Sequence, residues 1–263
     1  MPDNTIQKYI SERKGQLSFI SMSSQKLIVI GLAGATCAGK TTLSQLLCNL
    51  FGTKAKKLHQ DDFYHPDEYK GHVFLPELNH VNWEIETAFD NEKLAKTVKD
   101  FLNVVRPRNG LSSNKAEKGQ HHLRRILEAL EKEVTSESLL KSNSEVSSSC
   151  QKLFEKALED GLFLPHGLLV VEGIHVLTNP KLADLFDLKL FVTLDHKTCA
   201  ARRALRNYEP PDPPGYFEKI VWPSYVEQES PLKADQVTFL DGSLPINHNF
   251  SLVLQSLLRQ SLD

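Results

Sequence analysis

The sequence predicts an α/β fold in which a mainly parallel five-stranded sheet lies between two layers of helices, a three-layer sandwich. Two observations predict it: short apolar runs rich in β-branched residues recur along the chain, and amphipathic helical segments separate them. The expected strands are 27–30, a segment that ends near 59–60, 168–171, 188–192 and 236–240. Because strands and helices alternate, we expect parallel pairing with right-handed crossovers.

The first strand and the helix that follows it have the clearest patterns. Residues 27–30 (LIVI) form a short apolar run that ends at Gly31, which is typical of a strand buried on both faces of a parallel sheet. Residues 40–51 carry Leu and Phe at helical spacing, which predicts a helix docked on the sheet. The chain therefore runs from a buried strand through a glycine-rich loop into a helix.

The middle of the chain breaks the alternation of strands and helices. From about 106 to 161 there is no strand-like run and polar residues predominate, although 122–130 has helical periodicity. We interpret this segment as a long, partly disordered insertion, and residues 1–25 as a flexible N-terminal extension. A single domain over 26–263 then contains the sheet. The insertion is the expected place for a protein partner, whose nature the sequence does not indicate.

Charge and hydropathy exclude several classes of protein. The chain has 31 Lys and Arg against 33 Asp and Glu, a net charge of −2, so no overall charge attracts it to nucleic acid or a membrane surface. No apolar run is long enough to cross a bilayer, and the N-terminus lacks the apolar segment of a secretory signal. The four cysteines are scattered without a paired motif. We expect a cytosolic protein, with the nucleus as a second location.

Residues 34–41 (GATCAGKT) match the phosphate-binding motif G-x-x-x-x-G-K-[ST] between the expected strand and helix. In this motif backbone N–H groups surround phosphates, the lysine reaches the β- and γ-phosphates, and the hydroxyl binds Mg²⁺. The sequence therefore predicts a P-loop NTPase fold that binds a nucleoside triphosphate and Mg²⁺. The expected nucleotide-binding residues here are Gly34, Ala35, Thr36, Cys37, Ala38, Gly39, Lys40, Thr41 and Thr42.

The P-loop does not show where the γ-phosphoryl group goes. The guanine-binding motif N-K-x-D is absent, which favours a small-molecule kinase. Asp61 and Asp62 follow the second expected strand, with Phe63 and Tyr64 behind them. A carboxylate at the carboxyl end of a parallel strand faces the ligand crevice, where it could accept a proton from an attacking hydroxyl and help hold Mg²⁺. The alternative is a solvated turn, and local chemistry does not choose between the two aspartates.

Three further positions are candidates for the acceptor side. Trp83 and Glu84 are expected to open a helix, where they could stack on a base and accept from ribose hydroxyls. A core Trp beside a helix-start acid is an equal alternative. Glu172 ends the third expected strand and should lie near the metal.

Arginines gather on an expected helix that leads into a proline-rich loop. Arg202, Arg203 and Arg206 are spaced so that Arg202 and Arg206 share one helix face. Such a cluster could clamp phosphates and act as a small lid, and a solvated basic helix end is the alternative.

Together these segments resemble the nicotinamide riboside kinases, within the uridine-kinase-like group of P-loop nucleoside kinases. The most specific stretches are 206–217 (RNYEPPDPPGYF) and 221–225 (VWPSY). Residues 32–42, 60–66, 170–173 and 240–242 occur in the family's order, so the resemblance covers 26 to about 242 apart from the insertion.

The resemblance implies ATP-dependent phosphorylation of the 5′-hydroxyl of nicotinamide riboside, with nicotinic acid riboside as a second substrate, in NAD biosynthesis and salvage. The enzyme class would be a ribosylnicotinamide kinase that uses ATP and Mg²⁺ and binds neither nucleic acid nor membranes. A uridine or cytidine kinase is the alternative within the same chemistry. A catalytically weak nucleotide-binding adaptor is the alternative from another class.

The resemblance also assigns roles to residues. Asp61 would be the proton acceptor and would border the metal site with Thr41 and Glu172. Trp83 would stack on nicotinamide, and Glu84, where the family usually has Asp, would accept from the ribose hydroxyls. The implied catalytic residues are Asp61, Lys40, Arg202 and Arg206. The implied substrate-side residues are Asp61, Asp62, Phe63, Tyr64, Trp83, Glu84, Arg203, Tyr208 and Glu209. The implied ATP contacts beyond the P-loop are Arg202, Arg206, Tyr208, Asp241, Gly242 and Ser243.

Overall fold

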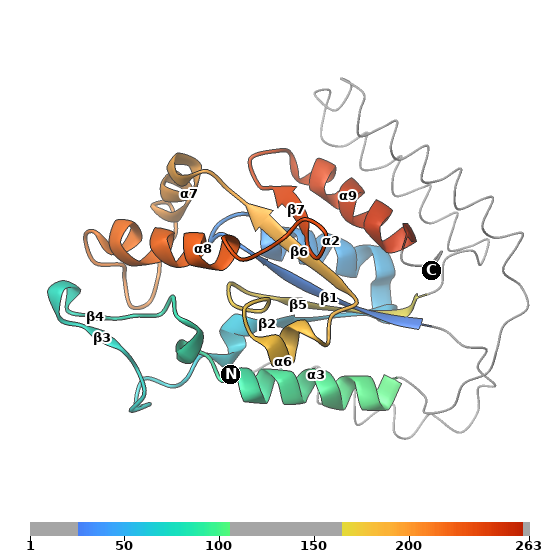
Figure 1. The fold of residues 1–263 in the computed structure, drawn as a ribbon, viewed down its shortest axis with the longest axis horizontal. Helices are drawn as coiled ribbons and strands as arrows, with labels where there is room; N and C mark the ends of the chain where they lie inside the picture. The colour runs from blue at the N-terminus through green and yellow to red at the C-terminus, as the bar shows by residue number, and fades with distance from the viewer. Residues whose placement is uncertain (1–25, 106–164, 260–263) are drawn as a thin grey trace, which may run out of the picture.

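The computed structural model describes residues 26–105 and 165–259 (Figure 1). The predictions for the N-terminal extension and for the insertion at about 106–161, with its helix over 122–130, lie outside the described residues. Strands from both described ranges pair in one sheet, so the two ranges build a common core.

The main sheet has five strands in the order β2-β5-β1-β6-β7, and every pair is parallel. The strands are β1 (Lys26–Gly34), β2 (Ala55–His59), β5 (Pro165–Glu172), β6 (Leu188–Thr193) and β7 (Thr238–Asp241). All five expected strands are confirmed. The hydrophobic core is centred on β1 and β5, whose apolar side chains are almost fully buried on both faces of the sheet.

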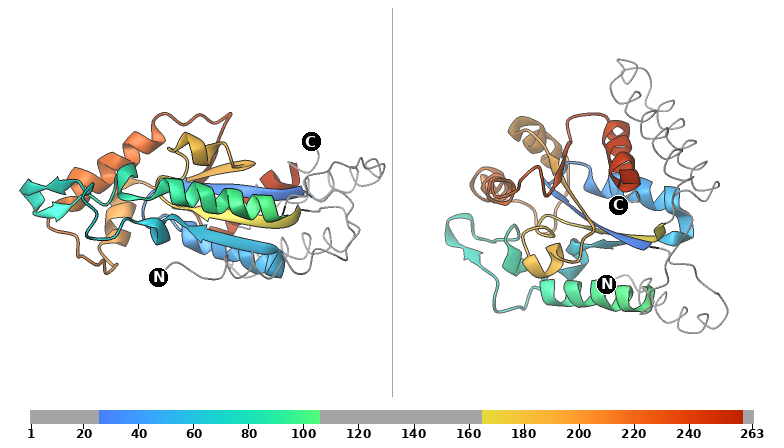
Figure 2. Two further views of the ribbon diagram at one scale, coloured as in Figure 1. Left: turned by 90° about the horizontal axis from the view of Figure 1, so that it is seen from below. Right: turned by 45° about the vertical axis from the view of Figure 1, so that its right-hand side comes forward.

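Helices cover both faces of this sheet (Figures 1 and 2). The α-helices are α2 (Lys40–Phe51), α3 (Asn91–Val105), α6 (Pro180–Ala183), α7 (His196–Arg203), α8 (Trp222–Glu229) and α9 (Ile246–Arg259). Helix α9 packs against α2, and α6 packs against α3. Along the sheet, the connection from β1 to β2 runs toward the β2 edge, and the connection from β2 to β5 runs back in the opposite direction. Because parallel strands are joined by right-handed crossovers, the helices of these two connections, α2 and α3, lie on opposite faces of the sheet.

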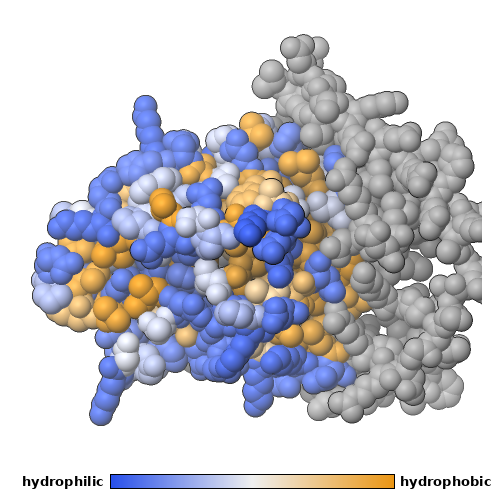
Figure 3. Space-filling view, in the orientation of Figure 1, coloured by the Kyte–Doolittle hydropathy of each residue, from blue (hydrophilic) through white to orange (hydrophobic). Residues whose placement is uncertain are grey.

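Short elements connect the larger ones. Single helical turns occur at η1 (Gly52–Lys54), η2 (Gln60–Phe63), η3 (Pro76–Leu78) and η4 (Glu86–Ala88), and η6 (Phe217–Val221) is a π-helical turn that runs into α8. A hairpin of β3 (Phe74–Leu75) and β4 (His80–Val81) projects from one end. Its two-residue strands are too short for a sequence pattern to predict them. At this end of the molecule Val73 and Phe74 are exposed, and Figure 3 shows hydrophobic atoms there.

Two local predictions were wrong. Residues 82–84 are not a helix start, and α3 begins only at Asn91. Instead, the backbone N–H of Glu84 bonds to the side chain of Asn82, a local bond that competes with helix formation. Helix α7 ends at Arg203, so Arg206 lies beyond it and the two outer arginines do not share a helix face. Among the helices of 26–105 and 165–259, none is long and apolar enough to span a membrane.

Candidate active site

The P-loop curls where β1 ends at the carboxyl edge of the sheet. Gly34 has φ +132°, and a Cβ there would lie 2.2 Å from the carbonyl oxygen of Val192 in β6. Gly39, directly before α2, has φ +95°. Side-chain-bearing residues rarely adopt such conformations, so the two motif glycines allow the backbone to turn sharply against the sheet. The N-terminus of α2 follows directly, as phosphate binding requires.

Lys40 is buried at the start of α2. Its Nζ donates to the carbonyl oxygens of Gly34, at 3.0 Å, and Ala35, at 2.8 Å. An ammonium group has three donors, so one hydrogen remains for a phosphate oxygen. Burial lowers the pKa of Lys40, and the carboxylates of Glu172 and Asp61 oppose this shift. The lysine thus links the loop backbone to the acidic side of the pocket.

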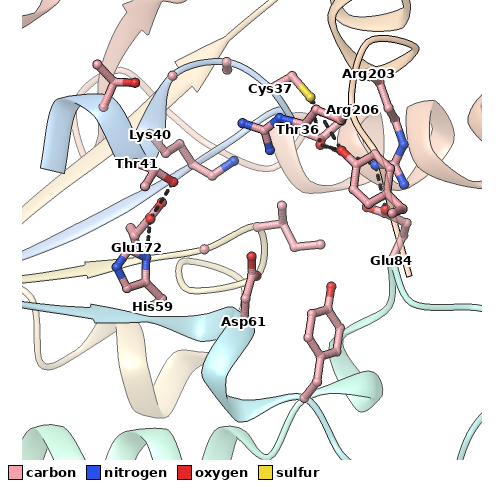
Figure 4. Close-up of a pocket in the computed structure, with 17 residues that line it drawn as sticks. Thr36, Cys37, Lys40, Thr41, His59, Asp61, Glu84, Glu172, Arg203 and Arg206 are labelled. Carbon is pink, nitrogen blue, oxygen red and sulfur yellow. Dashed lines mark hydrogen bonds and ion pairs between the residues drawn. The ribbon is translucent and has the colours of Figure 1, made fainter. Parts of the chain in front are cut away.

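Glu172, at the end of β5, connects the P-loop helix to the neighbouring strand. Thr41 Oγ1 donates to Glu172 Oε1 over 2.8 Å, and His59 Nδ1 lies 2.6 Å from the same oxygen (Figure 4). Burial opposes ionisation of Glu172, but the hydrogen bonds from His59 and Thr41 together with the charge of Lys40 leave its pKa below the ordinary value. The hydrogen bond to Glu172 raises the pKa of His59. Glu172 is therefore an ionised acid.

Asp61 is the second residue of η2. In Figure 4 it points from the end of β2 into the space between Lys40 and Glu84, and it lines the same pocket as the P-loop. Both Asp61 and Asp62 are exposed, but only Asp61 lines this pocket. Partial enclosure by the protein raises the pKa of Asp61, and the charge of Lys40 partly opposes this. A carboxylate with a raised pKa is a better proton acceptor near neutral pH.

The oxygen atoms around the P-loop are suitable ligands for Mg²⁺. The Thr41 hydroxyl and the carboxylates of Asp61 and Glu172 are hard oxygen ligands, and all three residues line the pocket. No cluster of three His, Cys, Asp or Glu side chains that could hold a metal occurs within the described residues. Nucleotide-bound Mg²⁺ does not need such a cluster, because it commonly uses one or two carboxylates together with phosphates and water.

Arg203 organises the acceptor side of the pocket. Its Nη1 lies 2.9 Å from Glu84 Oε1, and its Nε and Nη2 donate to the two oxygens of Asp212 at 2.6 and 3.1 Å. Its guanidinium also lies over the ring of Tyr208, 4.3 Å from the centroid. Burial raises the pKa of Glu84, and Arg203 opposes this shift. One buried arginine therefore joins the segment that contains Glu84 to the loop that follows α7.

The segment that carries Trp83 and Glu84 is held by side chains from distant elements. The backbone N–H of Trp83 donates to the hydroxyl of Tyr216 over 2.9 Å. The carbonyl oxygen of Glu84 accepts from His175 Nε2 at 2.8 Å and from Ser224 Oγ at 2.6 Å. These tertiary bonds explain why the segment adopts an extended bend instead of the expected helical turn.

Two cavities meet at the carboxyl edge of the sheet. The first, of about 120 Å³, lies on the P-loop. The second, of about 240 Å³, is lined by Tyr64, His65, Asp67, Trp83, Glu84, Arg203, Tyr208, Glu209, Pro210, Asp212 and Tyr216. Tyr64, Glu84, Arg203 and Tyr208 line both cavities, so the P-loop opens directly into a space rich in aromatic rings.

The structure brings most of the sequence-predicted residues to these two cavities. The exceptions, which line neither cavity, are Gly34, Ala35, Asp62, Phe63, Arg202, Asp241, Gly242 and Ser243. Phe63 is buried in the hydrophobic core. Arg202 Nη1 donates to the carbonyl oxygens of Cys37 and Gly242, at 3.3 and 3.0 Å, so it ties the loop after β7 to the back of the P-loop.

Sequence reasoning missed His59 and His175 as site residues. His59 is directly opposite Glu172 in the register of β2 and β5, and no pattern within either strand predicts that register. His175 lies close after Glu172 in the sequence, but its bond to Glu84 joins positions 91 residues apart. The available signal was only that each histidine lies at or just past the carboxyl end of an expected strand.

This fold and site define a P-loop kinase: a phosphate-binding loop, an acid at the end of the adjacent strand, and a second cavity beside it. No family model matches the chain. Over 241 residues it is 25% identical to nicotinamide riboside kinase 2 of Homo sapiens, covering 90% of this chain and 83% of that protein. It is 29% identical over 218 residues to the nicotinamide riboside kinase of Schizosaccharomyces pombe, covering 80% and 82%.

The similarity extends to uridine kinases. The chain is 26% identical over 186 residues to a uridine kinase of Oceanobacillus iheyensis, covering 71% of this chain and 70% of that protein. A solved sugar kinase structure from Janibacter aligns with 89% of this chain and 95% of that chain at 12% identity, with a TM-score of only 0.36. The chain is thus similar in sequence to nicotinamide riboside kinases and, over a shorter stretch, to a uridine kinase.

Proposed function

We propose that this protein transfers the γ-phosphoryl group of ATP to the 5′-hydroxyl of nicotinamide riboside, forming the mononucleotide and ADP in NAD salvage. The observation that carries the proposal is the second cavity, which joins the P-loop pocket through four shared residues. A riboside bound there would present its hydroxyl toward Asp61 and the P-loop. The cytosolic location expected from the sequence, with the nucleus as a second site, stays a prediction.

The charge of the second cavity favours a cationic ring. Asp67, Glu84, Glu209 and Asp212 line it together with Arg203, which is already paired with two of these four acids. Aromatic rings of Tyr64, Trp83, Tyr208 and Tyr216 complete its wall. Carboxylates and aromatic faces both attract cations. The pyridinium ring of nicotinamide riboside is cationic, whereas uridine is neutral and nicotinic acid riboside carries an additional carboxylate.

The proposed reaction needs a proton acceptor, charge neutralisation and alignment. Asp61 takes the proton of the 5′-hydroxyl as that oxygen bonds to the γ-phosphorus and the bond to the ADP oxygen breaks. Lys40 and Arg206, which line the P-loop pocket, stabilise the charge on the phosphoryl oxygens. Thr41, Asp61 and Glu172 would hold Mg²⁺, which neutralises phosphate charge when bound. The residues then act mainly by positioning the two substrates.

Coupled ADP release tests the proposal. With ATP and Mg²⁺ present, nicotinamide riboside, nicotinic acid riboside, uridine and cytidine are compared at equal concentration. We expect the highest kcat/KM with nicotinamide riboside. Preferential turnover of uridine or cytidine would assign the protein to the pyrimidine nucleoside kinases, and absence of turnover with all four would favour the nucleotide-binding adaptor.

A Glu209→Gln variant tests the charge argument separately. Glu209 is exposed at the second cavity, and the substitution keeps its size while it removes one negative charge. We expect kcat/KM for nicotinic acid riboside to rise several-fold relative to nicotinamide riboside, because like charges repel. An unchanged ratio would show that the carboxylate of Glu209 does not face the pyridine substituent.

A further inference from the structure

His59 contacts the metal-side acid of the P-loop pocket, and the phosphate-binding motif does not include it. Its Nδ1 lies 2.6 Å from Oε1 of Glu172. Because an ionised carboxylate only accepts hydrogen bonds, Nδ1 carries the proton in this contact. The histidine therefore donates one hydrogen bond to an acid that also accepts one from Thr41.

The backbone determines this contact. His59 is the last residue of β2 and Glu172 is the last residue of β5, and the two residues face each other in the parallel ladder. The Glu172 side chain is 5% exposed and that of His59 is 29% exposed. The bond thus joins a buried carboxylate to a partly open imidazole at the carboxyl edge of the sheet, where the P-loop also lies.

Two donors on one oxygen restrict the orientation of the Glu172 carboxylate. The Thr41 hydroxyl has a single hydrogen and two lone pairs. While its hydrogen points to Glu172, its lone pairs are available for a cation on the phosphates. If the carboxylate rotated away, the hydroxyl could turn its hydrogen toward the cation instead, and that orientation repels a cation.

We infer that His59 is a positioning residue for nucleotide-bound Mg²⁺: its Nδ1–H holds the Glu172 carboxylate, which in turn orients the Thr41 hydroxyl. The inference rests on the proposed phosphoryl transfer, but it does not depend on which riboside is the acceptor. Loss of a residue that orients a metal ligand typically weakens metal affinity about 10- to 100-fold. The effect should therefore appear in nucleotide binding as well as in turnover.

Calorimetric titration with ADP, in the presence and absence of Mg²⁺, measures this effect without catalysis. For the wild-type protein we expect Mg²⁺ to tighten ADP binding. His59→Ala should reduce that tightening about tenfold, with ADP affinity in the absence of Mg²⁺ unchanged. His59→Asn places an amide N–H near the position of Nδ1 and should keep most of the tightening, whereas His59→Gln extends past that position and should behave like Ala.

His196→Ala is the matched control. His196 Nε2 lies 2.8 Å from Glu218 Oε2, a comparable histidine–carboxylate contact on the surface that is separate from both cavities. This variant should bind ADP with Mg²⁺ as the wild type does. Comparing His59→Ala with His196→Ala separates the specific role of His59 from the general effect of losing a histidine–carboxylate contact.

The outcomes separate this inference from the proposed function. A folded His59→Ala protein whose Mg²⁺-linked ADP binding equals that of the wild type overturns the inference alone, as does an Asn variant that is no better than Gln. If Ala does not fold, the difference between Asn and Gln decides. A wild-type protein that binds ADP without any contribution from Mg²⁺ overturns both the inference and the proposed function.

Discussion

The phosphate side and the acceptor side of the pocket are built in different ways. The phosphate side is one continuous segment, residues 34–42, in which backbone N–H groups, two glycines with positive φ and one lysine lie between β1 and α2. The acceptor side is assembled from segments around 61–64, 83–84 and 203–216. Side-chain bonds such as those of Arg203 join these segments.

This difference shows how one scaffold can combine a constant site for the phosphoryl donor with a variable site for the phosphoryl acceptor. Backbone atoms surround a phosphate whatever the neighbouring side chains are, so the donor side depends on few residue identities. On the acceptor side each contact depends on a particular pair of side chains. Loops on a rigid sheet can change such pairs without disturbing the core.

The largest expected effect comes from the acid between the two sides. Asp61→Ala should lower kcat about 10²- to 10⁴-fold, because the proton acceptor is lost, while ADP binding measured by calorimetry without Mg²⁺ stays intact. Asp62→Ala is the matched control and should keep near wild-type kcat, since Asp62 does not line the pocket. If the two variants exchanged these behaviours, the assignment of the base would be wrong.

The next largest effect should be on the stability of the acceptor side. Arg203→Ala leaves the buried Glu84 without its ion-pair partner, and breaking a buried pair on one side typically costs about 3–5 kcal/mol. Urea unfolding should therefore show a lower free energy of unfolding. The double variant Arg203→Met with Glu84→Gln should recover part of the loss, because the buried position 84 then carries no unpaired charge, while Asp212, the other partner of Arg203, is partly exposed. No recovery in the double variant would point to lost packing against Tyr208 instead.

A smaller effect should distinguish binding of the riboside from binding of ATP. Trp83→Ala removes an aromatic face of the second cavity, and base–aromatic stacking is worth about 1–3 kcal/mol. Initial-rate kinetics should show the riboside KM raised about tenfold and the ATP KM nearly unchanged. Trp222→Ala, which removes a tryptophan that lines neither cavity, should not change the ratio of the two KM values. Equal increases in both KM values after Trp83→Ala would mean that Trp83 is structural.

The smallest expected effect is a pH dependence of the acceptor side. Burial lowers the pKa of His175, so between its folded value and its ordinary value the unfolded chain binds more protons. Its contribution to stability is present above the ordinary value of 6.5 and is lost as pH falls through the folded value. Urea unfolding from pH 7.5 to 5 should show a steeper loss of stability for the wild type than for His175→Gln. Parallel profiles would contradict this.

The sequence predicted the phosphate side almost completely. The boundaries of α2 agree with the expected helix over 40–51, and β1 contains the whole expected apolar run. These features depend on local periodicity, on glycines and on the order of strand, loop and helix along the chain. Local chemistry left the proton acceptor open between Asp61 and Asp62, and the family resemblance assigned it to Asp61. In the structure Asp61, and not Asp62, lines the pocket.

The acceptor side was predicted as a set of residues but not as an arrangement. The helix expected at Trp83 and Glu84 does not form, because bonds from Tyr216, His175 and Ser224 hold the backbone in another conformation. Arg203 was expected near the substrate, yet its simultaneous pairing with Glu84 and Asp212 has no signal in the sequence.

By itself, the sequence determined the parallel sheet, the P-loop and the chemical types of the residues around it. The tertiary structure alone decided which of those residues meet: His59 with Glu172 through strand register, Arg203 with Glu84 across the pocket, and Arg202 with the back of the P-loop. The physical reason is the separation in sequence over which each kind of interaction acts. Backbone preferences and hydrophobic periodicity act between residues close in sequence, whereas register and ion pairing depend on how distant segments pack.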